Sequence, residues 1–230
     1  MADRIVGIDL GTSTSAVAAL DQGQARILFL DERERVIPTV VGINQAGNII
    51  VGSTAKDQLE TNPEYTFTGL KRLLGRKADD PQIVSWSQMV AYEIVAGPRG
   101  EAFVRGPDKI YDPVDLIAHV FAKLREIARQ SLGEEVTRCV VGVPAHFDVT
   151  QKEAIKRAAQ LGVFADDAGT PGLVVGARQH VLPRVRVRAV ADVVEQRGDH
   201  PVPVAPGVGK VQRGVVADLV RLVLGIAGEV

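Results

Sequence analysis

One short stretch near the start of the chain brings a carboxylate, a glycine and several hydroxyl side chains together. An apolar segment, 5–9, ends in Asp9, and a second apolar segment follows at 16–20. Small residues make up most of the sequence between them, among them Gly11, Thr12, Ser13 and Thr14. A tight turn directs backbone N–H groups into a concavity that suits phosphate oxygens, and Asp9 could hold a hydrated metal ion on them. The alternative is an ordinary hairpin without a ligand.

A basic segment, 71–77, is the second candidate for chemistry, because it reads Lys-Arg-Leu-Leu-Gly-Arg-Lys. A lysine beside a phosphate loop would stabilise charge on a terminal phosphate. The alternative is a solvated basic face. Two other reactive side chains, His146 and Cys139, stand alone in the sequence, so we expect structural roles for both, with Cys139 as a small core residue.

The composition sets the class of protein. The chain has 230 residues, 46% of them hydrophobic, and a formal net charge of −1. This length allows one large domain or two small ones, and the charge shows no basic surplus for nucleic acid. The N-terminus lacks a secretory signal and no apolar run reaches the length of a membrane span, so we expect a cytoplasmic protein with no membrane partner.

The hydrophobic pattern predicts a mixed α/β domain. Strands are expected at 5–9, 16–20, 25–30, 39–43, 49–52, 89–96, 101–104 and 136–143. Helices are expected at 55–60, from Asp112-Pro113 to a C-cap at Gly133, and from about 150 to 161.

These motifs, in this order, resemble the ATPase domain of the seventy-kilodalton heat-shock chaperones (DnaK type). The resemblance covers about residues 4–161. It rests on five segments: 8–15, 36–41, 62–64, 71–77 and 141–147. The family's fold would be the first lobe of an actin-like (ribonuclease H-like) α/β ATPase, a mixed sheet with flanking helices, here incomplete. Sugar kinases of the same superfamily lack the lysine segment, which disfavours them.

The resemblance also implies roles for particular residues. Asp9 would lie beside hydrated Mg²⁺, and Lys71 would be the catalytic lysine. The phosphates of ATP would be bound by Gly11, Thr12, Ser13, Thr14 and Lys71. Pro144 and Lys152 would relay the nucleotide state between domains, although the family usually has Arg where Lys152 stands. Ser13, Thr14 and His146 also depart from the commoner residues.

The implied function is that of an ATP-hydrolysing molecular chaperone that assists protein folding, with ATP and Mg²⁺ as cofactors. The implied partners are unfolded polypeptides, J-domain co-chaperones and nucleotide-exchange factors. For this chain we expect weak nucleotide binding and impaired or absent hydrolysis. The alternative function is a non-catalytic remnant or interaction protein.

The resemblance ends near residue 161. We expect residues 1–161 to form the lobe, with 38–113 as an inserted smaller subdomain and 162–230 as an unrelated tail. The tail contains no Ser, Asn or Tyr, and lacks the family's glutamate motif and second phosphate loop. The Val, Arg, Gly, Ala and Pro of the tail are the residues that a GC-rich gene encodes when it is read out of frame. A frameshift is therefore one explanation of the tail, and a divergent domain is the alternative. Without the family's later strands, the sheet of the first lobe would keep an unpaired edge prone to aggregation.

Overall fold

A computed structural model describes residues 4–21, 24–144, 146–162 and 173–176, and the structural statements below refer to these residues. Most of the tail, 162–230, lies outside them, so the expected division into lobe, inserted subdomain and tail stays a prediction. In the described part of the chain, every helix is too short or too polar to cross a bilayer.

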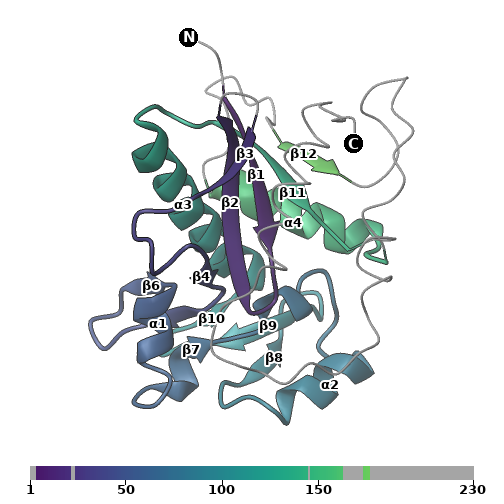
Figure 1. The fold of residues 1–230 in the computed structure, drawn as a ribbon. Coiled ribbons are helices and arrows are strands. Elements are labelled where there is room, and N and C mark those ends of the chain that lie inside the picture. Colours follow the sequence, from purple (N-terminus) through teal and green to yellow (C-terminus); the bar gives the residue numbers. More distant parts are fainter. Residues whose placement is uncertain (1–3, 22–23, 145, 163–172, 177–230) are drawn as a thin grey trace, which may run out of the picture.

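A mixed sheet is the centre of the fold (Figure 1). Its main path runs β12-β11-β1-β2-β3, and β4 pairs with β2 beside β3. The bounds are β1 Ile5–Leu10, β2 Thr14–Asp21, β3 Gln24–Leu28, β4 Ile37–Pro38, β11 Arg138–Gly142 and β12 Leu173–Gly176. β1 is antiparallel to β2 and parallel to β11. The sequence correctly predicted the antiparallel start and the buried strand that contains Cys139.

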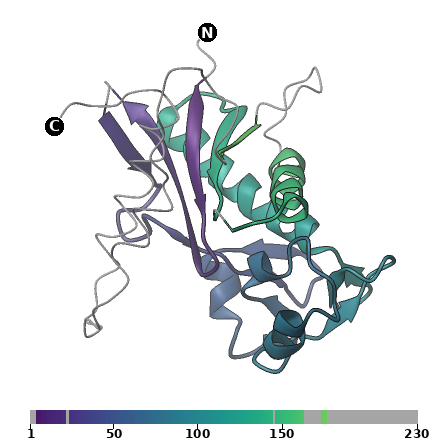
Figure 2. The ribbon, with the colours of Figure 1, turned by 90° about the vertical axis from the view of Figure 1, so that its right-hand side faces the viewer.

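Two helices, α3 (Pro113–Leu132) and α4 (Val149–Leu161), pack on each other and cover one face of this sheet (Figure 2). The side chain of Asp112 accepts a hydrogen bond from Val114 N at 2.9 Å, and Gly133 closes α3 in the left-handed conformation at φ 69°. α4 begins with a capping box between Asp148 and Gln151. These local signals set where each helix starts and stops.

The small-sheet region, residues 41–111, continues the same core below the main sheet. It contains two three-stranded sheets, β6-β5-β7 and β10-β9-β8. Their strands are β5 Val41–Ile43, β6 Ile49–Val51, β7 Thr66–Phe67, β8 Ile94–Ala96, β9 Ala102–Arg105 and β10 Ile110–Tyr111. The helical pieces are α1 Ser53–Asp57, η1 Pro63–Tyr65, η2 Leu70–Arg72 and α2 Pro81–Ser87. Phe67 and Phe121 are among the largest side chains of the shared core.

Three expectations need correction in this region. The strand expected at 89–96 covers only Ile94–Ala96, because Tyr92 turns inward to bond the Thr68 carbonyl. The helix expected at 55–60 runs from Ser53 to Asp57. α2 was not expected, although Asp80 caps it by accepting from Gln82 N at 2.8 Å.

A further strand extends the main sheet beyond β11. β12 pairs in parallel with β11, with Val140 opposite Val174 and Gly142 opposite Gly176. Because α4 lies between these strands in the sequence, β11, α4 and β12 form a parallel crossover unit. β-branched residues suit such a strand, and the open backbone groups of β11 provide its hydrogen-bond partners.

Candidate functional site

The turn between β1 and β2 is closely folded. Leu10 lies opposite Ser15 in the antiparallel register, so residues 11–14 make the connection. A Cβ atom placed on Gly11 would come within 2.2 Å of the Thr14 carbonyl oxygen. Only glycine fits there without moving the backbone.

A second contact ties this turn to the segment that leads into the small-sheet region. Thr39 N donates to the Ser13 carbonyl at 2.8 Å, and the hydroxyls of Ser15 and Thr39 lie 2.7 Å apart in a buried position. The short pairing of β4 with β2 continues this contact. These contacts hold the turn against the segment around Thr39, and a ligand loop that is held in this way is preorganised.

Lys71 reaches the base of the turn from η2. Its Nζ donates a hydrogen bond to the Leu10 carbonyl at 2.5 Å, and only 8% of the residue is exposed. The ring of Phe147 lies 5.5 Å from Nζ. Gly69 precedes η2 in the left-handed conformation, φ 64°, and a Cβ there would strike the Trp86 ring. The structure thus brings the lysine of the basic segment, sixty-one residues away, to the turn.

Asp9 and Lys71 form a coupled pair of charges. Val6, Ile8 and Leu10 are fully buried in the main core, so strand alternation turns Asp9 toward the opposite face of β1. Burial raises the pKa of Asp9 above 3.8, and the charge of Lys71 opposes that shift. Burial likewise lowers the pKa of Lys71 from 10.5, and the charge of Asp9 opposes it. Each charge therefore makes the other's burial less unfavourable.

Substitution of Lys71 by methionine is expected to raise the pKa of Asp9 further, because it removes the effect that lowers it. A carboxyl with a raised pKa in the folded state binds protons that the unfolded chain has released. Its contribution to stability is therefore full below pH 3.8 and is lost as pH rises through the folded-state pKa. In Lys71→Met the folded-state pKa of Asp9 is higher, so this contribution to stability persists to higher pH.

The Asp9 carboxyl carbon can be titrated by NMR in the parent chain and in Lys71→Met. Lys109→Met is the control, because Lys109 lies on the Tyr111 ring, away from this pair. An Asp9 titration unchanged by Lys71→Met would show that the two charges do not interact.

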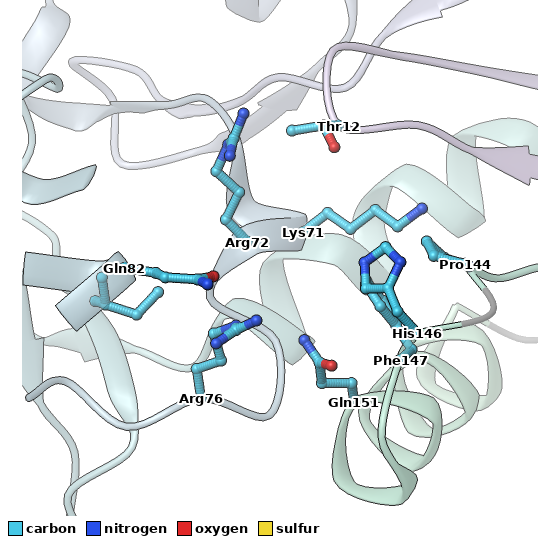
Figure 3. A pocket seen from close by; sticks show the side chains of 10 residues that line it. Thr12, Lys71, Arg72, Arg76, Gln82, Pro144, His146, Phe147 and Gln151 are labelled. Atoms are coloured by element: carbon cyan, nitrogen blue, oxygen red, sulfur yellow. The ribbon is translucent and has the colours of Figure 1, made fainter. Parts of the chain in front are cut away.

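A cavity of about 240 Å³ opens beside this pair of charges (Figure 3). Three of the site residues predicted from the sequence line it: Thr12, Lys71 and Pro144. Asp9, Gly11, Ser13 and Thr14 belong to the same strand and turn but do not line the cavity. Lys152 lies half-buried in the first turn of α4 and does not line it either.

The other seven residues of the cavity were not recognised as site residues from the sequence, among them Arg72, Arg76, His146 and Gln151. Arg72 stacks on the Trp86 ring at 4.6 Å, and Arg76 pairs with Asp80 at 2.7 Å. The two arginines belong to the basic segment, for which a solvated face was the alternative interpretation. Their place at the cavity was therefore not predicted. Gln151 had no sequence signal beyond its place in a capping box.

The donor set is suited to phosphates and to a metal ion that the phosphates help to hold. Among the described residues, no three His, Cys, Asp or Glu side chains converge on one point. A metal ion beside Asp9 would therefore rely on one carboxylate, water and ligand phosphates, an arrangement that Mg²⁺ commonly adopts.

The comparisons with known proteins identify the family. A family model described as "Hsp70 protein" matches residues 5–164, and the chain belongs to this family. Its mixed α/β fold is that of the Hsp70 N-terminal ATPase region and is consistent with an actin-like ATPase lobe. The mitochondrial "Heat shock 70 kDa protein" of Solanum tuberosum is 40% identical over 159 residues. That alignment covers 69% of this chain and 23% of the relative.

Proposed function

We propose that residues 1–161 bind the phosphates of Mg²⁺-ATP as the first lobe of an Hsp70-type ATPase. The observation that carries this proposal is the bond from Lys71 Nζ to the Leu10 carbonyl, which holds a cation at the base of a glycine turn. A closely folded turn offers backbone donors to phosphate oxygens, and Lys71 adds the charge.

In this proposal each residue has a limited task. The backbone of Gly11 and the hydroxyls of Thr12, Ser13 and Thr14 donate to the β- and γ-phosphate oxygens. Lys71 neutralises charge on the terminal phosphate, and Asp9 accepts hydrogen bonds from the water shell of the metal. When bound, Mg²⁺ supplies charge neutralisation across the phosphates. Phosphoryl transfer depends mainly on such positioning and electrostatic stabilisation.

For the whole protein, we propose the role of a chaperone that acts on unfolded polypeptides with J-domain co-chaperones and nucleotide-exchange factors, in the cytoplasm. Family membership supports the chaperone role. We also keep as proposals the inserted subdomain at 38–113 and the relay through Pro144 and Lys152. Pro144 follows β11 and lines the cavity, and Lys152 lies at the start of the next helix, which suits a relay.

A second candidate function is nucleotide binding without turnover. It is favoured by the cavity lining, which contains Lys71, Arg72 and Arg76 and no carboxylate among its described residues. Such a surface binds phosphate but offers no carboxylate as a general base for the attacking water.

The binding proposal predicts that affinity rises with the number of phosphates, from AMP through ADP to ATP, in the presence of Mg²⁺. Substitution Lys71→Gln should weaken ATP binding roughly 10- to 100-fold, as loss of a charged hydrogen bond typically costs about 1.5–3 kcal/mol. The same substitution should leave AMP binding nearly unchanged, because AMP lacks the outer phosphates.

Isothermal titration calorimetry of the 230-residue chain measures this series, with Lys109→Gln as the matched control for loss of one positive charge. Circular dichroism verifies that each variant is folded. Equal affinities for AMP and ATP, or an equal loss in the two variants, would contradict phosphate binding at the turn.

A further inference from the structure

Two buried hydroxyl side chains lie where the turn after β1 ends. Ser15 is the second residue of β2, and Thr39 belongs to the segment that leads from β4 into the small-sheet region. Each residue is 1% exposed, and their hydroxyl oxygens lie 2.7 Å apart. Strand alternation puts Ser15 on the same face of β2 as Val17 and Ala19, which belong to the main core. The pair is therefore a polar contact on a strand face that otherwise carries apolar side chains.

Stability alone does not account for this pair of hydroxyls. A hydrogen bond between two side chains contributes little net free energy, because both groups give up bonds to water when the chain folds. Apolar side chains of the same shape at both positions can be equally stable. A hydrogen bond adds direction, however, so it fixes how two segments lie relative to each other. Here those segments are the start of β2 and the entry to the small-sheet region.

The backbone of Thr39 holds the turn as well. Its N–H donates to the Ser13 carbonyl at 2.8 Å. The peptide group between Ser13 and Thr14 is trans and planar, so this bond also sets the direction of the Thr14 N–H. Thr39 therefore contacts the end of the turn twice, once through its backbone and once through its side chain.

Thr39 and Lys71 reach the turn from one packed unit. Val41, two residues after Thr39, pairs with Phe67, which stands four residues before Lys71. Val41 and Phe67 are both fully buried in the shared core. The pairing of β5 with β7 thus fixes the spacing between Thr39 and Lys71, and these two residues contact carbonyl groups at the two ends of the turn.

We propose that Thr39 is a positioning residue for the phosphate site: through Ser15, its hydroxyl holds the turn in the conformation that receives the outer phosphates of ATP. This inference rests on the proposed function and adds to it a residue outside both the turn and the cavity lining. Thr39 makes no contact with the phosphates in this proposal. A turn that is already held loses less conformational freedom when a ligand binds, so release of the turn weakens binding although every phosphate-binding group is retained.

Thr39→Val tests the hydroxyl, because it removes that group and keeps the shape of the side chain. Calorimetry of the 230-residue chain with Mg²⁺-ATP should give a Kd about three- to tenfold above the parent value, the range expected for one neutral hydrogen bond. AMP binding should stay unchanged, because AMP lacks the outer phosphates. Thr39→Ser retains the hydroxyl and should retain the parent affinity for ATP.

Thr66→Val is the matched control for loss of a buried threonine hydroxyl. Thr66 is also 1% exposed, and its hydroxyl donates to the Asn62 carbonyl at 2.7 Å and accepts from Gln58 Nε2 at 2.9 Å. These contacts lie within residues 58–66 and do not include the turn. Urea unfolding should show a loss of stability in both valine variants, whereas the affinity for ATP should fall only in Thr39→Val.

The double variant Ser15→Ala/Thr39→Val separates positioning from folding, and it serves in case Thr39→Val does not fold. It leaves neither hydroxyl buried without the other, so its free energy of unfolding should recover toward the parent value. Its affinity for ATP should stay reduced, because the directional contact between the two segments is still missing.

Four outcomes would overturn the positioning role of Thr39. They are parent ATP affinity in Thr39→Val, an equal loss of affinity in Thr66→Val, an equal loss in Thr39→Ser, and recovery of ATP affinity together with stability in the double variant. Each of them leaves the proposed function intact as long as the parent chain binds ATP more tightly than AMP. Equal binding of ATP and AMP by the parent chain would instead reject the proposed function, and this inference with it.

Discussion

The purified 230-residue chain is expected to release phosphate from ATP no faster than its Lys71→Ala variant. The described lobe supplies cations and a turn for the phosphates, and the cavity beside Lys71 has no carboxylate in its described lining. The charge of Asp9 interacts with that of Lys71, and Asp9 does not line the cavity. Loss of such positioning typically reduces the rate by orders of magnitude.

A steady-state phosphate-release assay measures this prediction, with Lys71→Ala as the background and Lys109→Ala as a control for charge. The two variants and the parent chain should give the same rate. A parent rate clearly above background that Lys71→Ala abolishes would contradict the prediction. It would show that residues outside the described part of the chain supply a second half-site.

Replacement of Gly75 by alanine is expected to cost much more stability than the same replacement of Gly133. Both glycines have φ 69°, so both variants lose about 1–2 kcal/mol to left-handed strain. A Cβ on Gly133 would meet nothing within 4 Å, whereas one on Gly75 would lie 2.8 Å from Gln151 N and 2.9 Å from its Cα. Moving the backbone of Gln151 is costly, so overpacking should lower the free energy of unfolding by about a further 1–3 kcal/mol in Gly75→Ala alone.

Urea unfolding of both variants measures this difference under identical conditions. A larger loss in Gly75→Ala means that the basic segment and the start of α4 are in tight contact, as the structure has them. Equal losses in the two variants would contradict that contact. The comparison matters for the site, because the same contact positions Arg76 and Gln151 on either side of the cavity.

Much of the fold could be predicted from local signals. Asp112-Pro113 and Gly133 mark the ends of α3, and both act as expected. The same Asp-Pro signature at Asp80-Pro81 starts α2, yet that helix was missed because it is only seven residues long and lacks a strong apolar period. The valine-rich tail favours strand locally, but the pairing of β12 with β11 was not predicted, because the residues of an edge strand do not reveal which backbone it pairs with.

The candidate site, too, could be predicted from the sequence only in part. The turn at Gly11 and the importance of Lys71 were visible as a motif and a resemblance, and the structure brings the two together. The roles assigned to individual residues there remain proposals. Arg72, Arg76 and Gln151 could not be identified, because their place at the cavity depends on how η2 packs against the start of α4. Such contacts between distant segments are a property of the packed fold.

Residue-resolved NMR of the 230-residue chain titrated with Mg²⁺-ATP tests the central claim most directly. The claim is that the turn after β1, together with Lys71, binds nucleotide phosphates. It predicts saturable shifts of the Gly11, Thr12 and Ser13 amide signals with ATP, much smaller shifts with AMP, and loss of the ATP shifts in Lys71→Gln. Amide signals of the turn that stay unchanged at saturating Mg²⁺-ATP, or that shift equally in Lys71→Gln, would contradict it.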